Sequence, residues 1–105
     1  MDINQCLPPH RFENTASTPG KGWGAPLIKP LEALALHPAA QVLHYGTACF
    51  EGMKAFWGRD GRVRLFRPEM NMRRLRRSSQ RLMMGDFDPD ELVECLKVRQ
   101  WGCIA

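Results

Sequence analysis

The sequence lacks the cysteine and histidine patterns that are typical of metal sites. It contains no Cys-x-x-Cys pair, and its three histidines show no metal-ligand spacing. The four cysteines are isolated in the chain, at Cys6, Cys49, Cys95 and Cys103. We therefore expect no metal site and reduced, intracellular thiols.

Long apolar runs are absent as well. No run approaches the roughly 20 residues that cross a membrane. The N-terminus lacks the apolar core of a signal peptide, and no transit peptide is evident. We expect no membrane partner.

The composition is that of one globular domain. Of the 105 residues, 44% are hydrophobic and 25% are charged. A chain of this length buries only ~60–70% of its unfolded surface, so its margin of stability is narrow.

Positive charge is concentrated in one segment. Residues 59–81 contain nine arginines against two acids, whereas residues 82–105 contain five acids against two bases. The formal net charge of the chain is +4. A focused positive field favours anionic ligands, but it does not choose between a phosphate cofactor and a nucleic acid.

Signals for regular structure are weak in the first half of the chain. Residues 1–22 show no sustained period and contain several prolines and glycines, so we expect irregular structure there. We expect extended segments over residues 25–28 and 34–36. A short helix is expected over residues 39–51, with Gly52 as its C-terminal stop.

The next segment predicts a β-hairpin. Residues 54–57 and 62–66 are β-prone and flank the turn Gly58-Arg59-Asp60-Gly61. The second strand would place Val63 and Leu65 on one face, and Arg62, Arg64 and Phe66 on the other.

Two helices are expected after the hairpin. The first runs from Pro68, whose missing N–H leaves no bond unmade in a first turn, to about Met84, and Gly85 ends it. Its packed arc would consist of Met72, Leu75, Ser79, Leu82 and Met83. The second begins after Asp88, an N-cap residue, with Pro89 at the first helical position.

Arg74 is the first candidate for a binding role. Arg74, Arg77 and Arg81 line one stripe of the expected helix, and Arg74 borders its apolar arc. A guanidinium held in this way suits bidentate phosphate contacts. Arg73 and Arg76 should point elsewhere into solvent. The alternative is that all five are surface residues or ion-pair partners of the acidic C-terminal third.

Three further residues have possible roles. Tyr45, the single tyrosine, could shape a ligand pocket or be a core aromatic with a satisfied hydroxyl. Glu51 could cap, pair with Lys54 or face water. Lys54 is not expected to form a Schiff base, because nothing nearby indicates the desolvation that would lower its pKa.

Several motifs resemble the branched-chain amino acid aminotransferases, pyridoxal-phosphate enzymes of fold type IV. The resemblance covers residues 22–96 in order. It includes Gly22-Trp23-Gly24, Leu36-His37-Pro38, His44-Tyr45-Gly46, Phe50-Glu51-Gly52-Met53-Lys54-Ala55, Arg64-Leu65-Phe66-Arg67-Pro68 and Asn71-Met72 with Arg74. It implies an α/β fold, a small mixed sheet with flanking helices, here incomplete.

The resemblance also implies residue roles. Arg74 corresponds to the arginine that binds the phosphate of pyridoxal 5'-phosphate, and Tyr45 to a tyrosine that lines the substrate side-chain pocket. The position before Arg74 is usually acidic in the family but is Arg73 here, which adds positive charge.

By resemblance, the whole enzyme is a homodimer that transfers the amino group of leucine, isoleucine or valine to 2-oxoglutarate. Relatives are cytoplasmic or mitochondrial. The Schiff-base lysine of the family lies far downstream, and residues 1–21 and 97–105 do not match. We therefore expect a fragment, a partial small domain with no catalytic residue of its own and no activity alone.

Two other hypotheses stay open. The chain could be a non-catalytic small domain that binds a full-length partner. It could also be a small basic nucleic-acid binder. The second is disfavoured, because Trp57 is the lone candidate for stacking on bases among the arginines.

Overall fold

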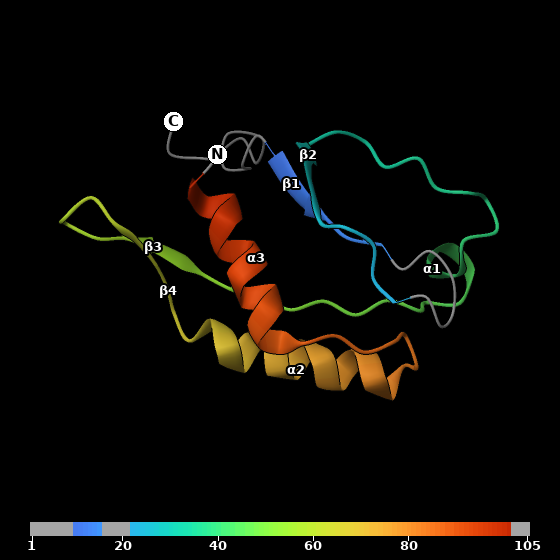
Figure 1. Ribbon diagram of the computed structural model, residues 1–105. Helices are drawn as coiled ribbons and strands as arrows, with labels where there is room; N and C mark the ends of the chain where they lie inside the picture. Colours follow the sequence, from blue (N-terminus) through green and yellow to red (C-terminus); the bar gives the residue numbers. More distant parts are fainter. Residues whose placement is uncertain (1–9, 16–21, 102–105) are drawn as a thin grey trace. The chain divides into compact units, whose positions relative to one another are not determined.

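The computed structural model describes residues 10–15 and 22–101 (Figure 1). The chain divides into two compact units, one formed by residues 1–34 with 95–105 and the other by residues 35–94.

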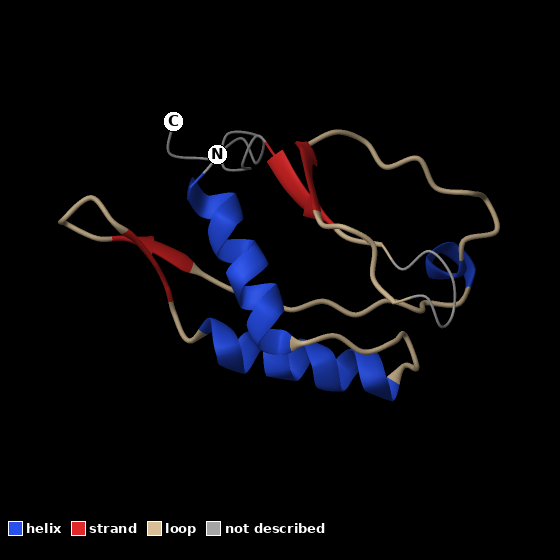
Figure 2. Cartoon of the chain, viewed as in Figure 1, coloured by secondary structure: helices blue, strands red, loops and turns tan. Residues whose placement is uncertain are grey.

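The α/β class is confirmed. In place of one small mixed sheet, the described residues form two separate two-stranded antiparallel sheets with three helices (Figure 2).

The first sheet pairs β1 (His10–Glu13) with β2 (Leu27–Pro30), with His10 opposite Pro30. On this ladder the Glu13 carboxylate accepts hydrogen bonds from Lys29 at 2.8 Å and Arg11 at 3.2 Å.

The prediction of irregular structure over residues 1–22 is wrong for β1. A strand of four residues is too short to show a period, and its hydrogen bonds come from β2. The expected extended segment over residues 25–28 is confirmed in part, since β2 begins at Leu27. Residues 1–9 and 16–21 lie outside the described residues.

The second unit begins with less regular structure than the sequence predicts. Helix α1 (Gln41–His44) has four residues, and no strand forms over residues 34–36. The helix stops well before Gly52, because Tyr45 leaves the helical conformation and Gly46 has a φ of +62°. A loop then leads to the next strand.

The predicted hairpin is confirmed by β3 (Ala55–Trp57) and β4 (Val63–Leu65), with Ala55 opposite Leu65. The Gly58 amide donates to the Arg62 carbonyl at 2.8 Å and closes the turn. Val63 and Leu65 are half-buried while the residue between them is exposed, which confirms their common face.

Helix α2 (Pro68–Arg81) confirms the expected start at proline. Met72 and Ser79 are buried, as the apolar arc predicts. The prediction is wrong for the end of the arc: Leu82 and Met83 are exposed. The helix stops at Arg81 and Met83 has a φ of +55°, so these two residues no longer follow the helical wheel.

Helix α3 (Pro89–Trp101) begins as predicted. The Asp88 carboxylate accepts hydrogen bonds from the amides of Asp90 at 2.8 Å and Glu91 at 3.1 Å, an N-cap that satisfies two otherwise unpaired donors. Within the described part of the chain, Met72 of α2 and Val93 of α3 are the buried core hydrophobic residues, and Pro68 at the start of α2 is buried as well.

Candidate functional site

A pocket of about 280 Å³ lies in the second unit, beside the hairpin and the first half of α2. Three of its lining residues are cationic and two are phenylalanines. The lining consists of Gly52, Lys54, Phe56, Phe66, Arg67, Met70, Asn71 and Arg74. No acidic side chain is among these residues, so the pocket favours an anion that also carries an apolar part.

Arg74 lines the pocket while it is held by Glu51. Its Nε donates to Oε2 of Glu51 at 3.1 Å, and its Nη2 donates to Oε1 at 2.5 Å. The Glu51 side chain is 14% exposed, whereas that of Arg74 is 49% exposed. The carboxylate is therefore largely covered, and the guanidinium still reaches solvent.

The charges of this pair stabilise each other. Hydrogen bonds from Arg74 lower the pKa of the Glu51 carboxyl against the opposing effect of burial, and a bond from Asn71 lowers it further. The same contact raises the pKa of the Arg74 guanidinium. Both groups are thus charged at neutral pH.

Asn71 connects the loop before β3 to helix α2. Its Nδ2 donates to Oε1 of Glu51 at 2.9 Å and to the carbonyl of Gly52 at 2.5 Å. Asn71 is 8% exposed, and both of these bonds are partly buried. Because Arg74 lies one helical turn beyond Asn71, the two side chains hold the same carboxylate.

The other two cationic residues that line the pocket lie just before β3 and α2. Arg67 precedes α2 in a left-handed conformation, with φ of 48° and ψ of 50°. This conformation is uncommon outside glycine and occurs at functional sites more often than elsewhere. Lys54 is exposed, and its carbonyl accepts the Phe66 amide at 3.3 Å, beside the end of the hairpin.

The structure separates the two residues that the sequence analysis selected. Arg74 lines the pocket, but Tyr45 does not and is 82% exposed just after α1. The pairing of Arg74 with Glu51 was not predicted. None of the three roles expected for Glu51 was this one, because 23 residues separate Glu51 from Arg74 in the chain.

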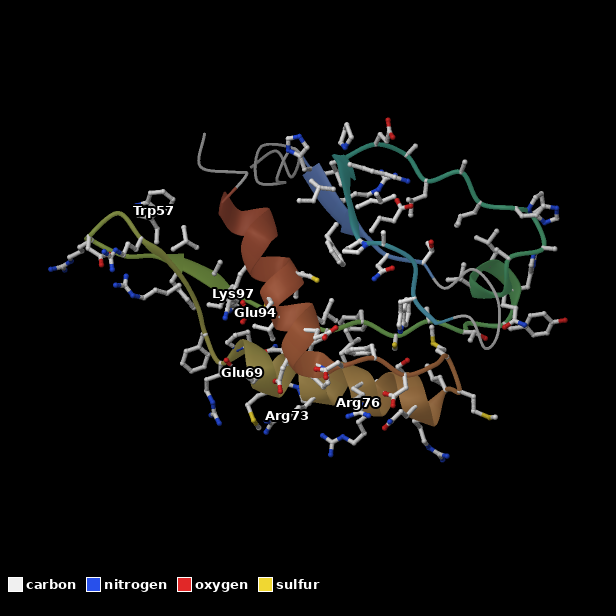
Figure 3. The ribbon with its side chains drawn as sticks, in the orientation of Figure 1. Trp57, Glu69, Arg73, Arg76, Glu94 and Lys97 are labelled. Carbon is white, nitrogen blue, oxygen red and sulfur yellow. The ribbon has the colours of Figure 1, made fainter. Side chains whose placement is uncertain are left out.

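The remaining arginines of α2 divide into two groups. Arg73, Arg77 and Arg81 are exposed. The prediction that Arg76 (labelled in Figure 3) is solvated is confirmed only in part. Its side chain is 42% exposed, but its Nε and Nη2 donate to the Asp86 carboxylate at 2.6 and 2.8 Å. Arg76 is thus an ion-pair partner of the acidic C-terminal third, as the alternative hypothesis proposed.

Cys49 and Cys95 are free, and Cys6 and Cys103 lie outside the described ranges. No group of histidine, cysteine or acidic side chains in residues 10–15 and 22–101 could hold a metal ion. Over the same residues, none of the helices is long and apolar enough for a membrane span.

No protein-family model matches the chain, but curated proteins do. It is 59% identical over 76 residues to a branched-chain-amino-acid aminotransferase of Monosiga brevicollis, 57% over 77 residues to the mitochondrial enzyme of Bos taurus, and 53% over 75 residues to the cytosolic enzyme of Rattus norvegicus. The matches cover 71–73% of this chain.

The resemblance predicted from the motifs is therefore confirmed. The chain spans about a fifth of the length of these relatives, at 18–20%. Over that part, it is similar to branched-chain-amino-acid aminotransferases from both cytosolic and mitochondrial sources.

Proposed function

We propose that this chain is part of a branched-chain amino acid aminotransferase of fold type IV, with residues 22–96 in the N-terminal small domain. The observation that carries the proposal is the identity of more than half over 76 residues to a named aminotransferase. The basic pocket adds support, because Arg74 lines it in a fixed position.

The residues of the pocket fit the phosphate of pyridoxal 5'-phosphate. A guanidinium offers parallel N–H donors that match phosphate oxygens, and Lys54 and Arg67 add positive charge. When bound, the pyridoxal ring supplies an electron sink for amino-group transfer. Within this part of the chain, the role of Arg74 is to bind and orient the phosphate.

In the whole protein, the activity would be transfer of the amino group of leucine, isoleucine or valine to 2-oxoglutarate. Tyr45 is proposed to line the pocket for the aliphatic side chain. Its ring is exposed, and so is that of Phe50, at 92%. Such exposed aromatic surface supports completion of the pocket by parts of the protein beyond the matched region, or by the second subunit of a homodimer.

The compartment is proposed to be the cytosol or the mitochondrion. Relatives of similar identity include a mitochondrial enzyme, at 57%, and a cytosolic enzyme, at 53%.

A chimera tests the proposal. Residues 22–96 replace the matching segment of the Bos taurus mitochondrial enzyme, and leucine transamination with 2-oxoglutarate is measured. We expect activity that requires pyridoxal 5'-phosphate and falls when Arg74→Ala is introduced. Arg77→Ala, on the exposed part of the same helix, is the matched control. A chimera that folds as the parent does but transfers no amino group would contradict the proposal.

A further inference from the structure

The two hydrogen-bonding edges of the Arg74 guanidinium differ in whether they already have a partner. An arginine has a side-on edge, formed by Nε–H and one N–H of Nη2, and an end-on edge, formed by Nη1 and the other N–H of Nη2. Glu51 occupies the side-on edge with both of its oxygens. A bidentate anion can therefore approach only the end-on edge while Glu51 stays in place.

Glu51 is fixed by more than Arg74. Asn71 donates to the same Oε1 atom and also to the Gly52 carbonyl, which ties the backbone of this loop to α2. The Glu51 side chain is 14% exposed. An incoming anion that displaced Glu51 would leave a carboxylate covered and short of donors, which is costly.

The end-on edge is open in the described part of the chain. Nη1 of Arg74 makes no hydrogen bond there, and Arg74 lines the pocket. Because Glu51 balances the charge of Arg74, the net positive charge of the pocket comes from Lys54 and Arg67. An anion at the end-on edge would thus meet two free N–H donors from Arg74, and two further cations line the same pocket.

We propose that Glu51 is a positioning residue that directs the end-on edge of Arg74 to a phosphate monoester. Glu51 and Asn71 keep their hydrogen bonds when the phosphate binds. The identity of the phosphate as that of pyridoxal 5'-phosphate rests on the proposed function. The choice of edge rests on the contacts of Glu51, Asn71 and Arg74 alone.

The Arg76–Asp86 pair provides an internal control. Asp86 occupies the side-on edge of Arg76 in the same manner, and the Gln80 side chain hydrogen-bonds to this carboxylate, but Arg76 does not line the pocket. The two arginines therefore share side-on pairing and differ in whether they line the pocket. Phosphate should distinguish the two arginines.

The test is an NMR titration of the full 105-residue chain with inorganic phosphate. It follows the guanidinium nitrogens of Arg74 and Arg76 and the carboxyl carbon of Glu51. We expect the Nη signals of Arg74 to shift while its Nε–H and the Glu51 carboxyl stay in place, with no shift at Arg76. A shift of the Glu51 carboxyl together with Arg74 Nε–H would overturn the inference, because Glu51 would then be displaced.

A variant of Glu51 provides a second test of the same inference. Glu51→Gln opens the side-on edge, so the phosphate-induced shift should extend to Nε–H of Arg74. Asp86→Asn is the matched change at Arg76 and should produce no phosphate shift. The wild-type titration does not depend on either variant, so a misfolded variant leaves the test intact. No shift of Arg74 with phosphate would also overturn the inference, whereas the proposed function fails separately, through an inactive chimera.

Discussion

Two arginine–carboxylate pairs lie in the same unit and differ in what they connect. Arg64 and Asp60 are four residues apart, pair through both Nη atoms at 2.8 and 2.6 Å, and have side chains about half exposed. Arg74 and Glu51 are 23 residues apart, and the carboxylate is mostly covered. The first pair belongs to a turn, whereas the second joins a loop to α2.

The difference shows which pair can shape a site. The Arg64–Asp60 pair uses the end-on edge of its arginine and stands on the exposed hairpin, where a single ion pair adds little stability. The Arg74–Glu51 pair is anchored by the buried Asn71 and leaves an end-on edge available. Anchoring and the free edge, rather than charge alone, distinguish the candidate site.

The largest effect on stability is expected from removal of the anchor. Asn71→Ala deletes two partly buried hydrogen bonds and leaves the Gly52 carbonyl and Glu51 short of a donor, so the free energy of unfolding should fall by ~1–3 kcal/mol. Urea denaturation measures it. Ser78→Ala, at an exposed position of the same helix, should stay within about 0.5 kcal/mol of wild type. Equal effects of Asn71→Ala and Ser78→Ala would contradict the role of Asn71 as the anchor of the Arg74–Glu51 pair.

On the hairpin, the turn should matter more than the ion pair. Gly61 has a φ of +73°, so Gly61→Ala should lower the free energy of unfolding by ~1 kcal/mol. Gly61→Asn tolerates this conformation and serves as the control. Asp60→Asn, which removes the charge that pairs with Arg64, should cost less than Gly61→Ala in the same urea experiment. A larger loss of unfolding free energy for Asp60→Asn than for Gly61→Ala would contradict this prediction.

A pH effect of smaller size is expected at the third pair, Arg76–Asp86. The hydrogen bond from Arg76 lowers the pKa of the Asp86 carboxyl from 3.8 to about 2. As the pH falls from 3.8 towards 2, the unfolded chain takes up this proton before the folded chain does, so stability is lost over that window. Thermal unfolding at a series of pH values measures the slope. Arg76→Gln should reduce it, and an unchanged slope would show that Asp86 is not held by Arg76.

Local signals account for the parts of the fold that were predicted correctly. Asp60-Gly61, Pro68 and the Asp88-Pro89 pair each act on their immediate neighbours, and the hairpin and the starts of both helices follow from them. Strand β1 was missed because its bonds come from β2.

The site was predicted only in part for the same reason. Helical spacing and the family motif selected Arg74, and the structure places it in a pocket. The pairing with Glu51 depends on how the loop before β3 meets α2, which no spacing rule in one sequence reports. The role of Tyr45 stays a prediction.

The most direct measurement of the central claim compares pyridoxal 5'-phosphate with pyridoxal, which lacks the phosphate. Binding of each to the full chain is measured for wild type, Arg74→Ala and the control Arg76→Ala. We predict that Arg74→Ala weakens pyridoxal 5'-phosphate about 10- to 100-fold and leaves pyridoxal unchanged. Arg76→Ala should change neither. Equal affinity of wild type and Arg74→Ala for pyridoxal 5'-phosphate would contradict the assignment of Arg74 as the phosphate anchor.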